Sequence, residues 1–112
     1  MAITEAYGGT WTSTPTETIL NTTTPETTVG VYEVWVDNDP LALNDTLEIR
    51  VKDKVIATSA QRTAFTAHLG PSDASNCAVA PSLILMHGWD VTIKQVGGAV
   101  GKLIPWSIRR VA

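Results

Sequence analysis

The chain has little of what metal-binding and membrane proteins need. Its 112 residues include one cysteine, Cys77, and two histidines, His68 and His87. A lone cysteine cannot form an internal disulfide, and no second cysteine or histidine stands at metal-ligand spacing from it. No apolar run approaches the roughly 20 residues of a membrane span, and the polar beginning of the chain is unlike a signal peptide. We therefore predict a cytoplasmically made protein with no metal, cofactor or membrane partner.

Motifs of catalysis are also missing. There is no Gly-X-Ser-X-Gly elbow and no identifiable pair of carboxylates on converging elements. Residues 96–102 look like a phosphate loop, but Val96 stands where the first glycine is needed and Leu103 follows Lys102 in place of Ser or Thr. The double glycine in this stretch instead suits a hairpin connection with positive φ. We predict no catalytic residues and a protein that is not an enzyme.

Positive charge is absent from the first 45 residues. They carry seven acids and no base, a net charge of −7, while residues 46–112 carry four acids and eight bases, a net charge of +4. A nucleic-acid-binding domain would normally be strongly basic, so we do not expect a nucleic-acid partner. Two interpretations of the split stay open. It is a chance feature of a threonine-rich leader, or it lets the acidic part of one copy meet the basic part of another.

What the sequence does contain is strand periodicity. In residues 44–57 the aliphatic side chains of Leu47, Ile49 and Val51 alternate with charged ones, as in a strand with one dry and one wet face. Further short apolar segments follow, joined by turn formers at spacings of about 8–12 residues. We predict an all-β fold: one antiparallel sandwich or barrel of about seven short strands, formed by residues 29–112. Trp35, Trp89 and Trp106 are expected to face inward.

Residues 1–28 differ from this predicted body. They hold eleven of the sixteen threonines, two prolines and few large apolar residues, which favours an extended N-terminal arm over a helix. Ordering such an arm costs about 1–2 kcal/mol per residue of backbone entropy, so it needs a surface to lie on. Either it lies on its own sheet, with an edge strand within residues 16–23, or it adds a strand to a neighbouring molecule and inserts Tyr7 and Trp11 there. We predict that the body is stabilised by its own dry faces and not by the arm, so that deleting residues 1–20 leaves a folded domain.

Three strands carry a resemblance to a known group of proteins. They are residues 45–54 (DTLEIRVKDK), 87–95 (HGWDVTIKQ) and 104–110 (IPWSIRR). Through them, residues 30–111 resemble small virion proteins of tailed bacteriophages. The resemblance implies a structural virion protein, most like a head decoration or cement protein. Such a protein would bind the major capsid protein on the outer capsid surface, act as a dimer or trimer of itself, and carry no catalytic residues.

Other functions stay open beside this one. The chain would suit another virion position, such as a tail, connector or head-fibre base protein, because a ring-forming protein also needs complementary faces. A carbohydrate-binding module is suggested by four tryptophans on a β-scaffold, although only Trp11 would be free to bind a sugar. The residues predicted to bind partners are the large apolar residues of the arm and the basic end of the chain: Tyr7, Trp11, Ile19, Leu20, Arg109 and Arg110.

Overall fold

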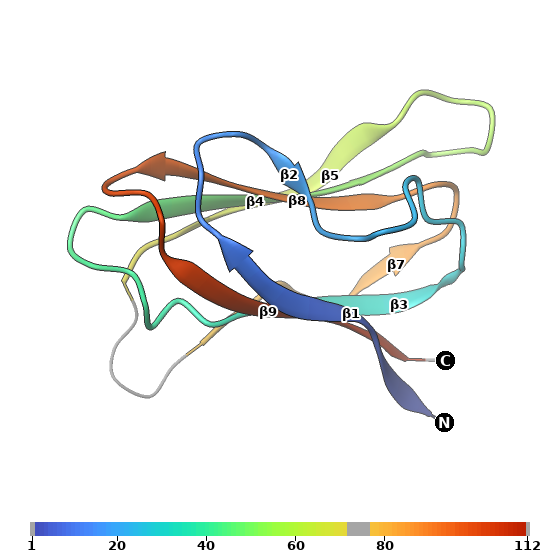
Figure 1. Ribbon diagram of the computed structural model, residues 1–112. Helices are drawn as coiled ribbons and strands as arrows, with labels where there is room; N and C mark the ends of the chain where they lie inside the picture. Colours follow the sequence, from blue (N-terminus) through green and yellow to red (C-terminus); the bar gives the residue numbers. More distant parts are fainter. Residues whose placement is uncertain (1, 72–76, 112) are drawn as a thin grey trace.

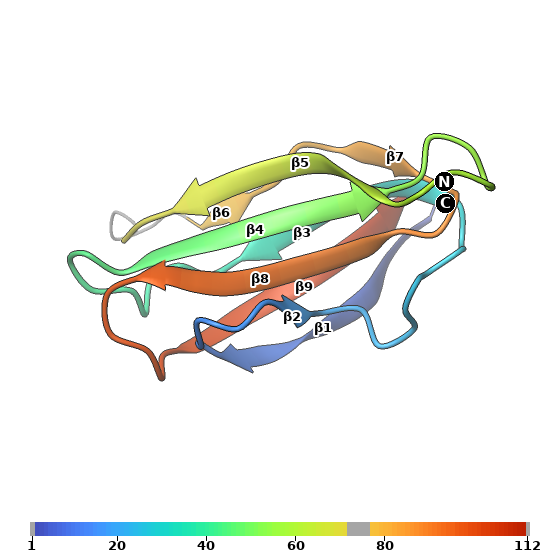
Figure 2. The same cartoon turned by 90° about the horizontal axis from the view of Figure 1, so that it is seen from above.

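The computed structural model describes residues 2–71 and 77–111, which form two antiparallel sheets packed face to face (Figures 1 and 2). The described residues contain nine strands: β1 (Ile3–Thr12), β2 (Thr18–Ile19), β3 (Gly30–Val36), β4 (Thr46–Asp53), β5 (Arg62–Leu69), β6 (Ala78–Val79), β7 (Leu83–Leu85), β8 (Asp90–Gly97) and β9 (Leu103–Val111). One sheet has the order β1-β9-β3-β6, with β7 also on β3, and the other has the order β2-β8-β4-β5.

The topology is that of a jelly roll. Strands β6 and β7 pair with opposite ends of β3 and so occupy one position in the five-stranded sheet. Counting them as one position gives eight, and successive positions mostly alternate between the two sheets, as in a jelly roll. The predicted all-β antiparallel sandwich is confirmed. The predicted number of about seven strands is too low, because the N-terminal segment supplies β1 and β2.

The core lies between the sheets and follows the alternation of the sequence. Leu47, Ile49 and Val51 of β4 are at most 4% exposed. They face the inner side together with Val91 and Ile93 of β8, with which Val51 and Ile49 are paired across the ladder. On β5, Phe65 and Leu69 also pack against this core. Period-two patterning therefore fixes which face of the four-stranded sheet is buried.

The N-terminal segment is part of this sandwich, which differs from the predicted division at residue 28. Strand β1 pairs along its length with β9, from Ile3 opposite Val111 to Thr12 opposite Leu103. Trp11 is 7% exposed and belongs to the hydrophobic core. The segment is extended, as predicted, but in the structure it lies on its own sheet. Strand β2 is the edge strand that the own-sheet alternative placed within residues 16–23.

The connection between β1 and β3 closes one side of the sandwich. Asn21, 2% exposed, accepts the N–H of Val91 (2.8 Å) and donates to the carboxylate of Asp90 (2.8 Å). Leu20 donates its backbone N–H to the carbonyl of Val91 (2.8 Å) and is itself 5% exposed. Through these bonds the connection covers part of β8. It therefore buries Asp90 and Thr92, which alternate with the inward-facing residues of β8 and would otherwise lie on an exposed face.

Trp89 fixes the other end of the same connection. Its indole N–H donates to the carbonyl of Thr28 (3.2 Å), and Glu26 exchanges two backbone hydrogen bonds with it. Tyr32 packs on its ring in a tilted arrangement at 4.4 Å between centroids, and Tyr7 packs against it edge-on at 6.4 Å. Tyr7 also donates its hydroxyl hydrogen to Glu26. Tyr7 of β1, Tyr32 of β3 and Trp89, immediately before β8, therefore form one aromatic cluster.

Because Trp11 fills the core, we expect Trp11→Ala to unfold the protein more easily. Replacing a buried Trp or Phe by Ala typically costs about 3–5 kcal/mol, through lost burial and the cavity left behind. Urea denaturation followed by tryptophan fluorescence would measure the change. Trp35→Ala is the matched control, since Trp35 is only partly buried and lies outside the core cluster. If Trp35→Ala is the more destabilising of the two, the N-terminal strand is not integral to the fold.

Candidate interaction surface

The six residues predicted to bind partners are placed very differently by the structure. Trp11 and Leu20 fill the chain's own core, which corrects the prediction for those two, because a buried side chain cannot contact a partner. Tyr7 is half-buried in the aromatic cluster, and Arg110 bonds to the carbonyl of Val29 (2.7 Å). Ile19, 45% exposed, lies on the four-stranded sheet, whereas exposed Arg109 lies on the five-stranded sheet. A binding role for these four stays a prediction.

An aliphatic row crosses the outer face of the five-stranded sheet. Ile3 of β1 is opposite Val111 of β9, Val111 is opposite Val31 of β3, and Val31 is opposite Ile84 of β7. Residues directly opposite each other share a face of the sheet. Tyr32, next to Val31, is 2% exposed and points inward, so the row points outward. Ile3 and Ile84 are 71% and 74% exposed.

A charged row lies beside the aliphatic row on the same face. Glu5 of β1 is opposite Arg109 of β9, and Arg109 is opposite Glu33 of β3. Ser107 donates its hydroxyl hydrogen to Glu5 (2.8 Å), and Ser82 donates to Glu33 (2.7 Å). The hydrogen bonds from Ser82 and from the indole of Trp35 hold the pKa of Glu33 below its usual value. The row therefore presents an arginine between two carboxylates.

Trp35 supports Arg109 from the next position along β3. The guanidinium carbon of Arg109 lies 4.1 Å from the centroid of the Trp35 ring, within the range of a cation–π contact. Trp35 was expected to face inward, but the inward positions of β3 are Tyr32, Val34 and Val36. Its neighbours Glu33 and Arg109 are on the outer face. A stacked arginine loses less side-chain entropy on binding than a free one, because its position is already restricted.

The outer face of the four-stranded sheet is charged, and its charges pair with one another. Glu17, on the segment before β2, contacts Lys52 (2.8 Å) and Arg50 (3.9 Å). Glu48 contacts Arg50 (2.7 Å), His68 (3.0 Å) and Lys94 (3.8 Å). Acids of the first 45 residues therefore meet bases of the remainder within one copy, at least for Glu17. Exposed pairs of this kind contribute little to stability, typically 0–1 kcal/mol each.

Glu48 is enclosed by these partners, with 8% of its surface exposed. Burial raises the pKa of its carboxyl, but the hydrogen bond with His68 and the charges of Arg50 and Lys94 outweigh burial, so the pKa lies below its usual value. His68 itself is exposed. His68 contacts the carboxylate of Glu48. Among the described ion pairs and hydrogen bonds, none joins His68 to a nucleophilic side chain.

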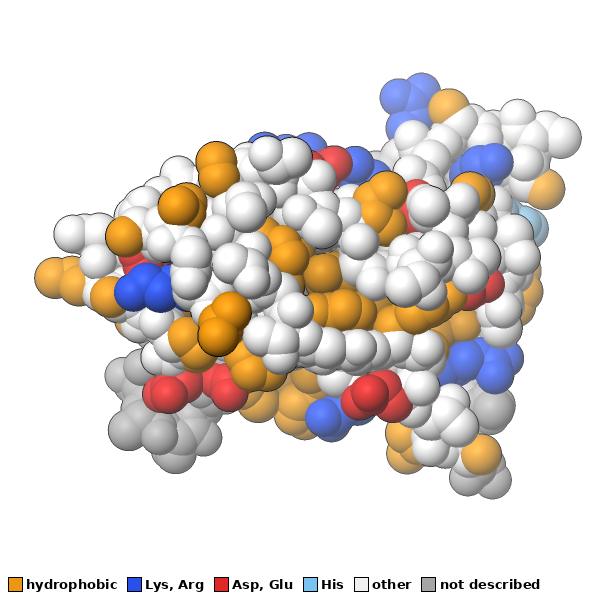
Figure 3. Space-filling model, viewed as in Figure 1, with side chains coloured by type: hydrophobic (Ala, Val, Ile, Leu, Met, Phe, Trp, Pro, Cys, Tyr) orange, Lys and Arg blue, Asp and Glu red, His pale blue; other side chains and the backbone are white. Residues whose placement is uncertain are grey.

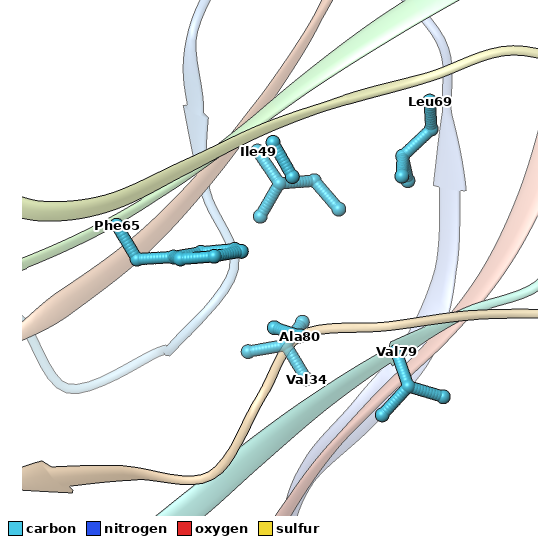
Figure 4. A pocket seen from close by; sticks show the side chains of 7 residues that line it. Val34, Ile49, Phe65, Leu69, Val79 and Ala80 are labelled. Carbon is cyan, nitrogen blue, oxygen red and sulfur yellow. The ribbon is translucent and has the colours of Figure 1, made fainter.

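Two cavities of the structure have mainly apolar linings. One, of about 20 Å³, lies between the two sheets beside β5 and β6, where Phe65 and Leu69 extend into the gap between Ile49 and Ala80, and Val79 points away from it (Figure 4). A space of this size holds about one water molecule, and its apolar walls would leave a water without partners. A larger groove of about 260 Å³ lies at the end of the sandwich near the chain termini, between β7 and the hairpin joining β4 to β5.

The described residues contain no group of three His, Cys, Asp or Glu side chains that could hold a metal ion, and this includes the acidic stretch at residues 37–45. They also contain no helix long and apolar enough to cross a membrane. Cys77 is free and exposed.

Comparisons with known proteins show a likeness in fold. No family model matches the chain, and no curated protein matches it. A solved chain from Bacillus endospore appendages, which are described as a novel family of disulfide-linked pili, matches with a TM-score of 0.50 and 17% sequence identity. The match covers 97% of this chain and 88% of that one. The all-β fold is therefore shared with a structural protein that assembles into fibres.

The pH dependence of stability tests the charge cluster around Glu48. A carboxyl with a lowered pKa stabilises the folded state above its unfolded pKa of about 4.3, and this contribution is lost as the pH falls through the folded pKa. We therefore expect Glu48→Gln to lower the urea midpoint at pH 7 and to change it much less at pH 3. A loss of equal size at both pH values would show that Glu48 acts through packing alone.

Proposed function

We propose that the chain is a structural subunit of an assembled particle, and more specifically a decoration protein on the head of a tailed bacteriophage. In this role it binds the major capsid protein through the outer face of its five-stranded sheet. The observation that carries the proposal is the pair of rows on that face: four aliphatic side chains across four strands, beside an arginine that lies opposite a glutamate on each neighbouring strand.

The chemistry of this face suits a protein partner. Aliphatic side chains that are 71% and 74% exposed gain free energy when a partner covers them, about 25 cal/mol per Å² of apolar surface. Arginine and aromatic residues are enriched where binding energy concentrates, and Arg109 and Trp35 are stacked there. The opposite sheet offers less, because its acids and bases already pair with each other. The resemblance of residues 45–54, 87–95 and 104–110 to phage virion proteins supports a capsid as the partner.

A second candidate function is a fibre subunit, which the likeness to the endospore appendage protein favours. Both candidates are structural and both use repeated contacts between subunits. The single cysteine weighs against a fibre held by disulfides, since Cys77 can join one copy to one other and no further. A fibre of this chain would therefore need non-covalent contacts. Electron microscopy of the purified protein distinguishes fibres from discrete particles.

Binding to undecorated phage heads tests the proposed face. We expect Ile3→Asp and Arg109→Glu to fold normally, because both side chains are exposed, but to bind heads at least tenfold more weakly than wild type. Removing an anchor from a desolvated contact commonly costs more than 2 kcal/mol, and 1.4 kcal/mol is a factor of ten. Competition between tagged wild-type and variant proteins for the same heads measures the ratio.

Ile19→Asp is the control for this experiment, because Ile19 is 45% exposed and lies on the four-stranded sheet. If binding uses the five-stranded sheet alone, as proposed here, this variant should occupy heads as well as wild type does, and the earlier prediction that Ile19 binds a partner would be wrong. If Ile3→Asp and Arg109→Glu occupy heads normally while Ile19→Asp does not, the binding face is on the four-stranded sheet instead. If all three variants occupy heads normally, neither outer face is the binding surface.

A further inference from the structure

Two loops form an apolar tip at the end of the sandwich opposite the chain termini. Leu43, on the loop between β3 and β4, is 84% exposed, and Val100, on the loop between β8 and β9, is 56% exposed. Figure 3 shows hydrophobic side chains at this end of the molecule, on the left. We call Leu43 and Val100 together the apolar tip.

A buried carboxylate holds the two loops of the tip together. Asp45 is 2% exposed, and its two oxygens accept the N–H groups of Ala42 (2.8 Å) and Ala99 (2.9 Å). These alanines immediately precede the two side chains of the tip. The hydrogen bonds from Ala42 and Ala99, together with the charge of Lys102, hold the pKa of Asp45 below its usual value. The exposed side chains are therefore presented by a fixed backbone, which lowers the entropy cost of binding.

The groove of about 260 Å³ lies at the other end of the molecule. Its apolar lining comes mainly from Val55, Ala64, Leu83 and Ile84, and we call these four residues the end groove. Strands β4 and β5 run along the length of the sandwich, so the hairpin that forms the end groove and the loops that form the apolar tip are at opposite ends (Figure 2).

The two ends also differ in charge. The loop that carries Leu43 holds Asp37 and Asp39, while the end groove is flanked by Lys54 and Arg62. Among the described residues none of these four takes part in an ion pair. Asp53, also beside the groove, accepts backbone N–H groups from Met86 (3.0 Å) and His87 (3.1 Å). An acidic, apolar tip thus matches a basic, apolar groove.

From this we infer that the chain associates head to tail, with the apolar tip of one copy seated in the end groove of the next. The interface joins two different patches, so it is heterologous, and its repetition builds a closed ring or a filament. It buries Leu43 and Val100 against Val55 and Ala64, and it brings Asp37 and Asp39 near Lys54 and Arg62. This contact goes beyond the binding of a capsid, since it uses the two ends of the sandwich. Ile84 belongs both to the end groove and to the aliphatic row on the outer face.

Mixing two defective variants tests the inference. In the tip variant, Leu43 and Val100 are both changed to Asp; in the groove variant, Val55 and Ala64 are both changed to Asp. All four side chains are exposed, so both variants should fold, which circular dichroism and a cooperative melt would verify. If a variant fails to melt cooperatively, serine replaces aspartate at the same positions. Ile19→Asp is the control, with an exposed aliphatic side chain outside both patches.

Association is measured by analytical ultracentrifugation at protein concentrations up to about 1 mM. At this concentration even a weak contact with a Kd near 1 mM is populated. Wild type and Ile19→Asp should associate with rising concentration, and less so in high salt. Each defective variant alone should stay monomeric, while an equimolar mixture should form a dimer and nothing larger, because one intact tip meets one intact groove. The inference is overturned if wild type stays monomeric, if either variant alone associates like wild type, or if the mixture forms no dimer.

Discussion

The structure depends on burying the inner faces of both sheets. The first part of the chain contributes to this burial although it has few large apolar residues. The β4 and β8 strands supply a continuous dry face, and Trp11, Leu20 and the buried amide of Asn21 close the side of the sandwich next to β8 and β9. Burying these groups offsets the entropy of ordering a threonine-rich segment that has no core of its own. The N-terminal residues are therefore a structural part of the domain.

This constraint decides which surfaces are left for function. With Trp11 and Leu20 in the core, the outer sheet faces and the two ends of the sandwich remain. The four-stranded sheet pairs its charges internally around Glu48 and Glu17, whereas the five-stranded sheet presents an exposed aliphatic row and a positioned Arg109. A surface that leaves apolar groups uncovered gains more from a partner than one whose charges are already satisfied.

Local patterning predicted the sheet class and the inward face of β4. It could not predict β1, because Gly8, Gly9 and alternating threonines give no apolar periodicity, and the pairing with β9 joins residues about 100 positions apart. It also misplaced Trp35, since Tyr-Glu-Val-Trp-Val is apolar enough on both faces that either could be buried. The aliphatic row comes from four strands distant in sequence, so only the register reveals it.

The central claim is that the chain works as an assembled structural subunit whose partner covers the outer face of the five-stranded sheet. The most direct measurement is a cryo-EM map of the particle that contains it, at a resolution that places side chains. We predict the jelly roll on the capsid exterior with Ile3, Ile84 and Arg109 buried against the shell. A map in which these three side chains face solvent, with the shell contacts made by the four-stranded sheet, would contradict the account.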